Sequence, residues 1–245
     1  MDVASFLETA DIETSSADYA ARFSGAAGQF FLKEQTRTTL QFLEYCKDKT
    51  VLDVGGGHCQ LAQPLIERGY NLTITGSDPV CGKRAAERLP PDSFSYLTCN
   101  SLALPFADRS FSVVLSFRLV PHADNWLGLL AELCRVAKEM VIIDYPDIRS
   151  FNIFYHLLFH LKKKMEGNTR TYRMFKRKQI AAAFATHGLE QISFQPQFFW
   201  PMVLHRQLQN EALSTGIEQP ARATGLTTLF GSPIIVCATR NPALS

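Results

Sequence analysis

Short apolar runs alternate with stretches of helical spacing along most of this chain. Seven runs have the length and the β-branched or aromatic content of strands. They cover residues 51–54, 72–76, 94–99, 112–116, 140–145, 189–199 and 232–239. Amphipathic helices are predicted between the runs, over 61–68, 83–89, 127–137 and 179–187. Strands that alternate with helices in this way predict an α/β fold with a doubly wound parallel sheet.

The flanks of this pattern are less regular. Residues 1–15 are polar and acidic, and we expect them to be loosely ordered. Ser16 is placed to cap a helix that Gly25 ends, and residues 30–46 predict a second amphipathic helix. Residues 207–227 carry a weak pattern that predicts a helix followed by a loop. The sheet is therefore expected to come from the remainder of the chain.

The sequence Val-Leu-Asp-Val-Gly-Gly-Gly-His-Cys-Gln at residues 51–60 joins the first strand to the first helix of the alternating region. Glycines at such a turn let the backbone approach a ligand closely, and the following helix presents free N–H groups. Asp78 follows the second strand, where a carboxylate can accept hydrogen bonds from both hydroxyls of a ribose. Together these features predict a site for a nucleotide-like ligand at the carboxyl ends of the strands.

Two details separate the ligand classes that use this geometry. In the dinucleotide fingerprint Gly-x-Gly-x-x-Gly, counted from Gly55, the third glycine would fall at Gln60. Asp53 precedes the glycines, and a carboxylate there repels a pyrophosphate but suits a ligand with an ammonium or sulfonium group. The pattern therefore favours a cationic ligand over a nicotinamide dinucleotide.

Two segments resemble the class I S-adenosylmethionine-dependent methyltransferases. Asp-Val-Gly-Gly-Gly at residues 53–57 resembles their motif I, commonly written Asp/Glu-x-Gly-x-Gly. Residues 100–116 resemble their Asp-x-x-x-Leu-Pro-Phe-x-Asp-x-Ser-Phe-Asp segment, with Asn100 and Ser112 in place of the first and last Asp. The chain is similar to the branch that includes ubiquinone and menaquinone C-methyltransferases.

A third match, at Glu132, Arg135 and Val136, extends the resemblance over about residues 16–145. It implies a Rossmann-like sheet of seven strands whose last strand is antiparallel, an N-terminal helical lid and a helical insertion after the fifth strand. The expected parts of a single domain are the lid over 1–48, the cofactor-binding core over 49–145, the insertion over 146–178 and the rest of the sheet over 179–245.

The resemblance also implies how S-adenosyl-L-methionine is held. The implied cofactor-binding residues are Asp53, Gly55, Gly56, Gly57, His58, Asp78, Pro79, Asn100, Ser101, Leu102 and Ser116. Asp53 and the backbone of Gly55–Gly57 are implied at the methionine portion, Asp78 at the ribose, and Asn100 with Ser101 and Leu102 at the adenine. His58 either touches the cofactor or only fills space. The carbonyl of Ser116 is expected at the ammonium group. Asn100 retains a carbonyl acceptor for the adenine amino group.

Methyl transfer from a sulfonium is an in-line displacement on an activated carbon, so the enzyme mainly supplies proximity and alignment. A general base helps when the acceptor is a hydroxyl, a thiol or an acidic carbon. His122 follows the fourth strand on the ligand side and is the favoured base, and a histidine that only shapes the turn is the alternative. Tyr145 and Tyr19 are further candidates for orienting the acceptor.

Composition narrows the remaining classes. With 46% hydrophobic and 20% charged residues and a net charge of +2, the chain fits a globular protein and gives no general case for nucleic-acid binding. Its six cysteines show neither Cys-x-x-Cys nor zinc spacing, so we expect reduced thiols. We recognise no signal peptide and no apolar run of about 18 residues, and we expect a cytoplasmic protein. No metal site is expected, because His156 and His160 lack a third ligand.

Residues 151–161 are the most unusual run, with large apolar side chains on almost every side of a predicted helix. The following window, 162–178, carries a net charge of +7 from eight basic residues and one acid. Such a segment, 151–178, favours a lid over a lipid-like substrate or a peripheral contact with a membrane surface. A helix packed into the domain with solvated lysines is the alternative. The apolar segment 198–205 predicts core, or else the wall of a substrate cavity.

The sequence therefore favours a methyltransferase that acts on a small, apolar acceptor. A binding or regulatory protein that keeps the cofactor fold without turnover is the alternative. A nicotinamide-dependent oxidoreductase is a third hypothesis, and Gln60 and Asp53 disfavour it.

Overall fold

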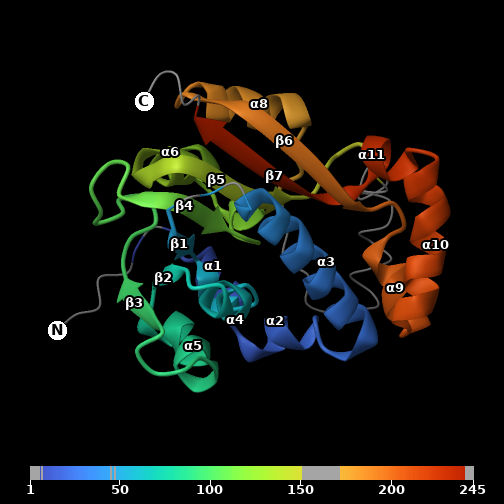
Figure 1. Ribbon diagram of the computed structural model, residues 1–245, viewed down its shortest axis with the longest axis horizontal. Helices are drawn as coiled ribbons and strands as arrows, with labels where there is room; N and C mark the ends of the chain where they lie inside the picture. Colours follow the sequence, from blue (N-terminus) through green and yellow to red (C-terminus); the bar gives the residue numbers. More distant parts are fainter. Residues whose placement is uncertain (1–5, 7, 45, 47, 151–171, 241–245) are drawn as a thin grey trace.

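A single sheet of seven strands organises the protein, in the order β3-β2-β1-β4-β5-β7-β6 (Figure 1). The computed structural model describes residues 6, 8–44, 46, 48–150 and 172–240. The strands are β1 (Thr50–Val54), β2 (Asn71–Gly76), β3 (Phe94–Thr98), β4 (Phe111–Ser116), β5 (Ala137–Tyr145), β6 (Leu189–Phe198) and β7 (Ser232–Arg240). The first five pair in parallel, and β7 runs antiparallel to both β5 and β6. The expected fold class is confirmed.

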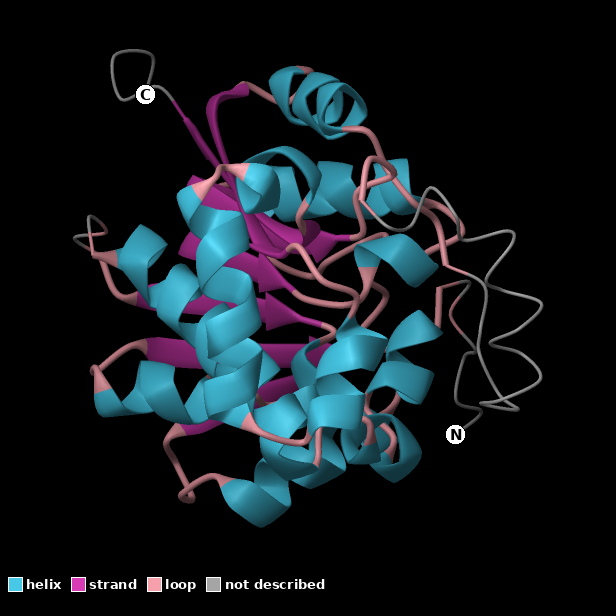
Figure 2. Cartoon of the chain, turned by 90° about the vertical axis from the view of Figure 1, so that its right-hand side faces the viewer, coloured by secondary structure: helices cyan, strands magenta, loops and turns pink. Residues whose placement is uncertain are grey.

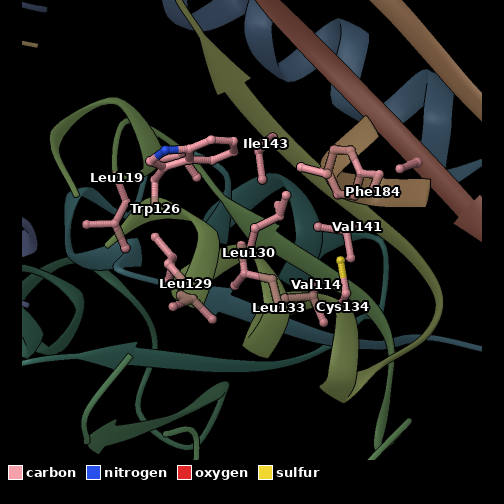
Figure 3. Close-up of a cluster of buried hydrophobic side chains, with 14 of the residues drawn as sticks. Val114, Leu119, Trp126, Leu129, Leu130, Leu133, Cys134, Val141, Ile143 and Phe184 are labelled. Atoms are coloured by element: carbon pink, nitrogen blue, oxygen red, sulfur yellow. The ribbon is translucent and has the colours of Figure 1, made fainter. Parts of the chain in front are cut away.

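The buried strands send alternate side chains into two cores, one on each face of the sheet. On one face Leu52, Val114 and Val141 pack against α6 (Trp126–Val136) and α8 (Arg177–Ala185), as Figure 3 shows for the part around α6. On the other face Val51 and Val113 pack against helices of the N-terminal half. A strand buried on both faces reads as a continuous apolar run, which explains why these strands stood out in the sequence.

The second core is covered by α3, α4 and α5. Their bounds are Gly25–Leu43, Ala62–Glu67 and Lys83–Arg88. α3 contributes Leu43 and α4 contributes Leu65, both fully buried. Figure 2 shows the strands side by side with helices flanking the sheet. The molecule is thus a three-layer arrangement in which the carboxyl edge of the sheet is left for the N-terminal segment.

The N-terminal segment corrects one expectation. Residues 10–14 form α1 (Ala10–Thr14), followed by α2 (Ala17–Ala21), rather than a loosely ordered tail. Ser16 caps α2 as expected by accepting a hydrogen bond from Tyr19 N, but Gly25 begins α3 instead of ending α2. α1 has no helical pattern of its own, so its order comes from burial against the sheet rather than from local sequence.

The region before β7 is more helical than its pattern predicts. It contains α9 (Met202–Leu208), α10 (Glu211–Ala223) and α11 (Leu226–Phe230), where a single helix and a loop were expected. Gly216 and Pro220 inside α10 weaken the periodic signal, and tertiary contacts decide the outcome. Phe198 packs with Phe30 and Phe31 of α3, so segment 198–205 contributes to core.

The basic insertion is described only at its flanks. Residues 151–171, including His156 and His160 and the apolar run, lie outside the described residues. Beyond them, Phe175 forms an isolated parallel bridge with Asp147, and Arg177 forms an ion pair with the fully buried Asp147 carboxylate at 3.0 Å. These contacts fix the second flank of the insertion to the end of β5.

Candidate cofactor-binding site

The loops after β1 and β4 enclose a hollow at the carboxyl edge of the sheet, between the two strands where the strand order reverses. Ligands of open α/β sheets bind at such a point. The residues that line the hollow are Thr14, Asp53, Gly55, Gly56, His58, Cys59, Gln60, Leu61, Phe117 and Arg118. The hollow therefore brings together four of the residues expected to bind a cofactor: Asp53, Gly55, Gly56 and His58.

The glycine loop is shaped by two residues that must lack a side chain. Gly55 has a φ of 71°, in the left-handed region that favours glycine, and it leads into the short 3-10 helix η1 (Gly56–His58). A Cβ on Gly56 would lie 2.3 Å from the carboxyl group of Asp53. The loop can therefore fold back over Asp53 only with glycine at both positions.

Asp53 is a buried carboxyl group beneath this loop. Its side chain is only 5% exposed, and no hydrogen bond to its carboxylate comes from the described part of the chain. Burial raises the pKa of this carboxyl to about 7. A buried carboxylate is unfavourable unless a cation or a hydrogen-bond donor compensates it. The position is thus suited to a positively charged ligand group.

α1 covers the end of β2. Ser77 donates its backbone N–H to Asp11 at 2.6 Å and its hydroxyl to the other oxygen of the same carboxylate. Farther along, Ser15 lies so close to the glycine loop that a Cβ on Gly57 would be 2.1 Å from its hydroxyl oxygen. The N-terminal segment therefore lies directly on the edge where the sequence places a ribose.

Asp78 and Asn100 follow β2 and β3, and each uses an oxygen to fix a local turn. Each accepts a hydrogen bond from the backbone N–H two residues later, at 2.8 Å and 3.0 Å respectively. A carboxylate and an amide oxygen keep further acceptor sites for a ligand. The expected ribose and adenine residues, Asp78, Pro79, Asn100, Ser101 and Leu102, do not line the hollow.

Aromatic side chains pack around His58, which lines the hollow. The rings of Tyr19 and Phe23 meet the imidazole of His58 edge-on, with centroids 6.1 Å and 5.5 Å away. Burial, and next the charge of Arg118, lowers the pKa of His58 to about 3, so this imidazole is neutral. Burial raises the pKa of Tyr19, which keeps its phenol protonated.

The remaining expected residues lie outside the hollow. The hydroxyl of Ser116 donates to the Val54 carbonyl at 3.0 Å and ties β4 to β1. His122 lies in η3 (Val120–His122), 6.4 Å from the ring of Tyr172. Tyr145 is fully buried against Phe175, and burial raises its pKa. Of the three acceptor candidates, Tyr19 contacts a residue of the hollow, namely His58.

Two charged residues of this site were missed in the sequence. Arg118 lines the hollow, and its signal was a single charge directly after the buried strand β4, inside the apolar run Phe-Arg-Leu-Val. Asp11 lies in a polar stretch without periodicity, so nothing local marked it.

The fold and the site first define a class of protein. The strand order, the antiparallel β7 and the glycine loop after β1 are those of the class I methyltransferase fold. Magnesium protoporphyrin IX methyltransferase from Synechocystis, solved with bound S-adenosylhomocysteine, aligns with a TM-score of 0.58 over 88% of this chain and 85% of that chain, at 12% identity. Geranyl diphosphate C-methyltransferase from Streptomyces coelicolor aligns with a TM-score of 0.59 over 85% of this chain and 79% of that chain, at 18% identity. Both likenesses concern the fold.

Sequence comparison gives a match of the same class. Residues 52–143 match the family model for the methyltransferase domain. The 2-methyl-6-phytyl-1,4-hydroquinone methyltransferase of Synechocystis sp. is 36% identical over 102 residues, which are 40% of this chain and 31% of that protein. The chain spans less than half the length of the first curated relatives that it matches, 31% to 41%. The expected resemblance to class I methyltransferases is confirmed for this domain.

Among the described residues, no group of three or more His, Cys, Asp or Glu side chains is arranged to hold a metal ion. Within the same ranges, each helix is too short or too polar to cross a membrane. All six cysteines are free thiols.

Proposed function

We propose that this protein transfers a methyl group from S-adenosyl-L-methionine to a small molecule. The observation that carries the proposal is Asp53, a buried carboxyl that has no hydrogen-bond or ion-pair partner among the described residues and lies beneath the glycine loop of a methyltransferase domain. Its environment suits a ligand that brings a positive charge to the hollow, as the ammonium or sulfonium group of this cofactor would. A nicotinamide dinucleotide would bring phosphates instead, and these repel a carboxylate.

The residues of the carboxyl edge have the chemistry to hold this cofactor. Asp53 and the backbone of Gly55–Gly57 would take its amino-acid end. Asp78 and Pro79 would take the ribose, Asn100, Ser101 and Leu102 the adenine, and the Ser116 carbonyl the ammonium group. When bound, the cofactor supplies a methyl group on a positively charged sulfur, which is already activated toward displacement.

The protein's own contribution is alignment and the exclusion of water. The glycine loop would hold the cofactor in line with the acceptor, and such positioning supplies much of the barrier reduction in a displacement. Tyr19 would orient the acceptor, and the support for this role is the contact of its ring with His58, which lines the hollow. His122 and Tyr145 stay predictions from the sequence.

The acceptor is proposed to be a small molecule with an apolar or aromatic part. The support from this chain is Phe117, whose ring lines the hollow, and the rings of Tyr19 and Phe23, which pack around His58. The named relatives act on a phytyl hydroquinone, a magnesium porphyrin and geranyl diphosphate, according to their names. Contact of segment 151–178 with a membrane surface stays a prediction, because most of that segment lies outside the described residues.

Binding of the cofactor product tests the proposal. Titration calorimetry of the full chain with S-adenosylhomocysteine and, separately, with NAD should show micromolar binding of the first and none of the second. Transfer of a labelled methyl group from S-adenosylmethionine to quinols, phenols and prenyl lipids then separates an enzyme from a cofactor-binding protein without turnover. Binding of NAD in place of S-adenosylhomocysteine would refute the proposal.

A further inference from the structure

Arg118 is a buried cation in the loop that follows β4. It is 8% exposed and lines the hollow. Its guanidinium stacks on the Phe23 ring, with Cζ 3.7 Å from the ring centroid, and Nη2 donates to Gln35 Oε1 at 3.0 Å. Nη1 is buried and has no hydrogen-bond partner in the part of the chain that the structure describes. The neighbours therefore fix the plane of the guanidinium and leave one of its donor edges unused.

No carboxylate of the described residues forms an ion pair with this guanidinium. Asp144 is also buried and bonds to Arg118. However, its Oδ1 accepts the backbone N–H of Arg118 at 2.5 Å rather than a side-chain N–H. Burial of an unpaired cation is unfavourable by several kcal/mol. An anionic ligand group in the hollow would supply the missing partner.

The backbone of Arg118 is also strained. Its φ is 60°, in the left-handed region that a residue with a long side chain rarely adopts. Such strain is concentrated at ligand and catalytic sites, where surrounding structure holds a side chain in a required position. Here the bond to Asp144 and the stacking on Phe23 hold it.

The hollow thus contains two buried charges of opposite sign that do not pair with each other. Asp53 contributes a carboxyl group from the glycine loop side, and Arg118 contributes a guanidinium from the β4 side. A single ligand group that carries both an ammonium and a carboxylate would offer a partner of opposite charge to each of these two side chains. An α-amino acid is such a group.

We propose that Arg118 binds the carboxylate of the amino-acid end of the cofactor, while Asp53 binds its ammonium. The unused Nη1 edge of a planar guanidinium matches a carboxylate, and hydrogen bonds between two charged groups are among the stronger ones. This inference rests on the proposed function, because it takes S-adenosylmethionine as the ligand. It also gives Phe23 and Gln35 a role as positioning residues, which prepare the cation before the ligand arrives.

A double-mutant cycle between protein and ligand tests the pairing. Calorimetry compares S-adenosylhomocysteine with S-adenosyl-3-thiopropylamine, which lacks only the carboxylate, on the wild-type chain and on Arg118→Met. The wild type should bind S-adenosylhomocysteine about 10- to 100-fold more tightly than the amine, the range of a hydrogen bond to a charged group. Arg118→Met should bind the two ligands within about threefold of each other, because the coupling is lost.

Matched variants separate this role from a structural one. Arg22→Met removes a cation that stacks on Tyr19, 5.1 Å from its ring centroid, and should leave the preference for the carboxylate intact. Arg118→Lys keeps a charge and should retain part of the preference. Should Arg118→Met not fold, equal affinity of the wild type for both ligands still overturns the inference. Undiminished preference in a folded Arg118→Met overturns it alone, whereas a wild type that binds neither ligand overturns the proposed function as well.

Discussion

Asp53 makes the site sensitive to pH at the scale of a single residue. Burial raises the pKa of its carboxyl to about 7, so in the free protein the group changes charge near neutrality. The cation of a bound ligand favours the ionised form and lowers this pKa. The complex therefore holds fewer protons than the free protein below about pH 7, and by linkage the affinity must rise with pH.

We therefore expect S-adenosylhomocysteine to bind more tightly as pH rises from about 6 to 8, with release of a proton near pH 6.5. Calorimetry in buffers of different ionisation enthalpy measures both quantities. The control is Asp53→Asn, which keeps the ligand's own titration and removes that of the protein. Affinity that falls with pH, or an equal pH profile in Asp53→Asn, would contradict the role of Asp53.

The sequence predicted those site residues that belong to one short local motif. The glycines and Asp53 stand in one short stretch, so strand, turn and acid could be recognised together. Arg118 is defined by partners far along the chain, with Gln35 separated from it by 83 positions. The burial of its guanidinium without an ion-pair partner arises only in the folded state. The spacing of residues in the sequence therefore cannot predict it.

At the scale of an element, α1 borders the site, because its last residue, Thr14, lines the hollow. The helix has five residues and no periodic pattern, yet Glu8, Asp11 and Thr14 at or near it are 4% exposed each. Glu8 accepts a hydrogen bond from the backbone N–H of Asp124 at 2.8 Å, and Asp11 accepts two from Ser77. Helices shorter than about 12 residues are marginal alone, so these anchors rather than propensity keep α1 in place. Local sequence therefore could not predict it.

Removing one anchor should ease the entry of the cofactor. Asp11→Ala frees both donors of Ser77, and hydrogen bonds to a charged group contribute about 1.5–3 kcal/mol each. Because α1 lies on the edge next to Asp78, its docking competes with ligand binding, and we expect Asp11→Ala to bind S-adenosylhomocysteine about 3- to 30-fold more tightly. Calorimetry gives the affinity, and limited proteolysis reports the release of α1.

Asp18→Ala is the control for that experiment, because Asp18 is an exposed acid of the adjacent α2. It should change neither the affinity nor the cleavage pattern. Weaker binding by Asp11→Ala would show instead that Asp11 takes part in holding the ligand.

The whole molecule depends on how the C-terminal helices attach to the sheet. Glu218 of α10 is 1% exposed and accepts the backbone N–H groups of Phe199 and Trp200, each at 3.0 Å. It also contacts the ring of His205 at 3.1 Å, and that ring packs against Phe30 of α3. One carboxylate thus joins α10, the turn after β6, α9 and α3. The sequence predicted the strands of the sheet because they are marked by apolar runs, but it gave no sign of this junction.

Glu218→Ala should destabilise the protein by roughly 3–5 kcal/mol, because it leaves buried donors without an acceptor. For a chain of this size that corresponds to a fall in melting temperature of about 10 °C. Scanning calorimetry measures it. Glu211→Ala on the same helix removes an exposed ion pair with Lys33 and should cost less than about 1 kcal/mol. Equal melting temperatures for the two variants would show that the junction contributes no more than a surface contact.

The position of β7 also has a consequence for synthesis of the chain. In the described part of the chain, β6 pairs only with β7, and β7 lies between β5 and β6. β6 is therefore translated before its partner exists, and α9, α10 and α11 leave the ribosome in the interval. The five parallel strands have all their parallel partners by residue 145, and only the edge of β5 that later pairs with β7 is open, so the first part of the sheet can assemble during translation. Its last two strands join together, once β7 emerges and inserts between its neighbours.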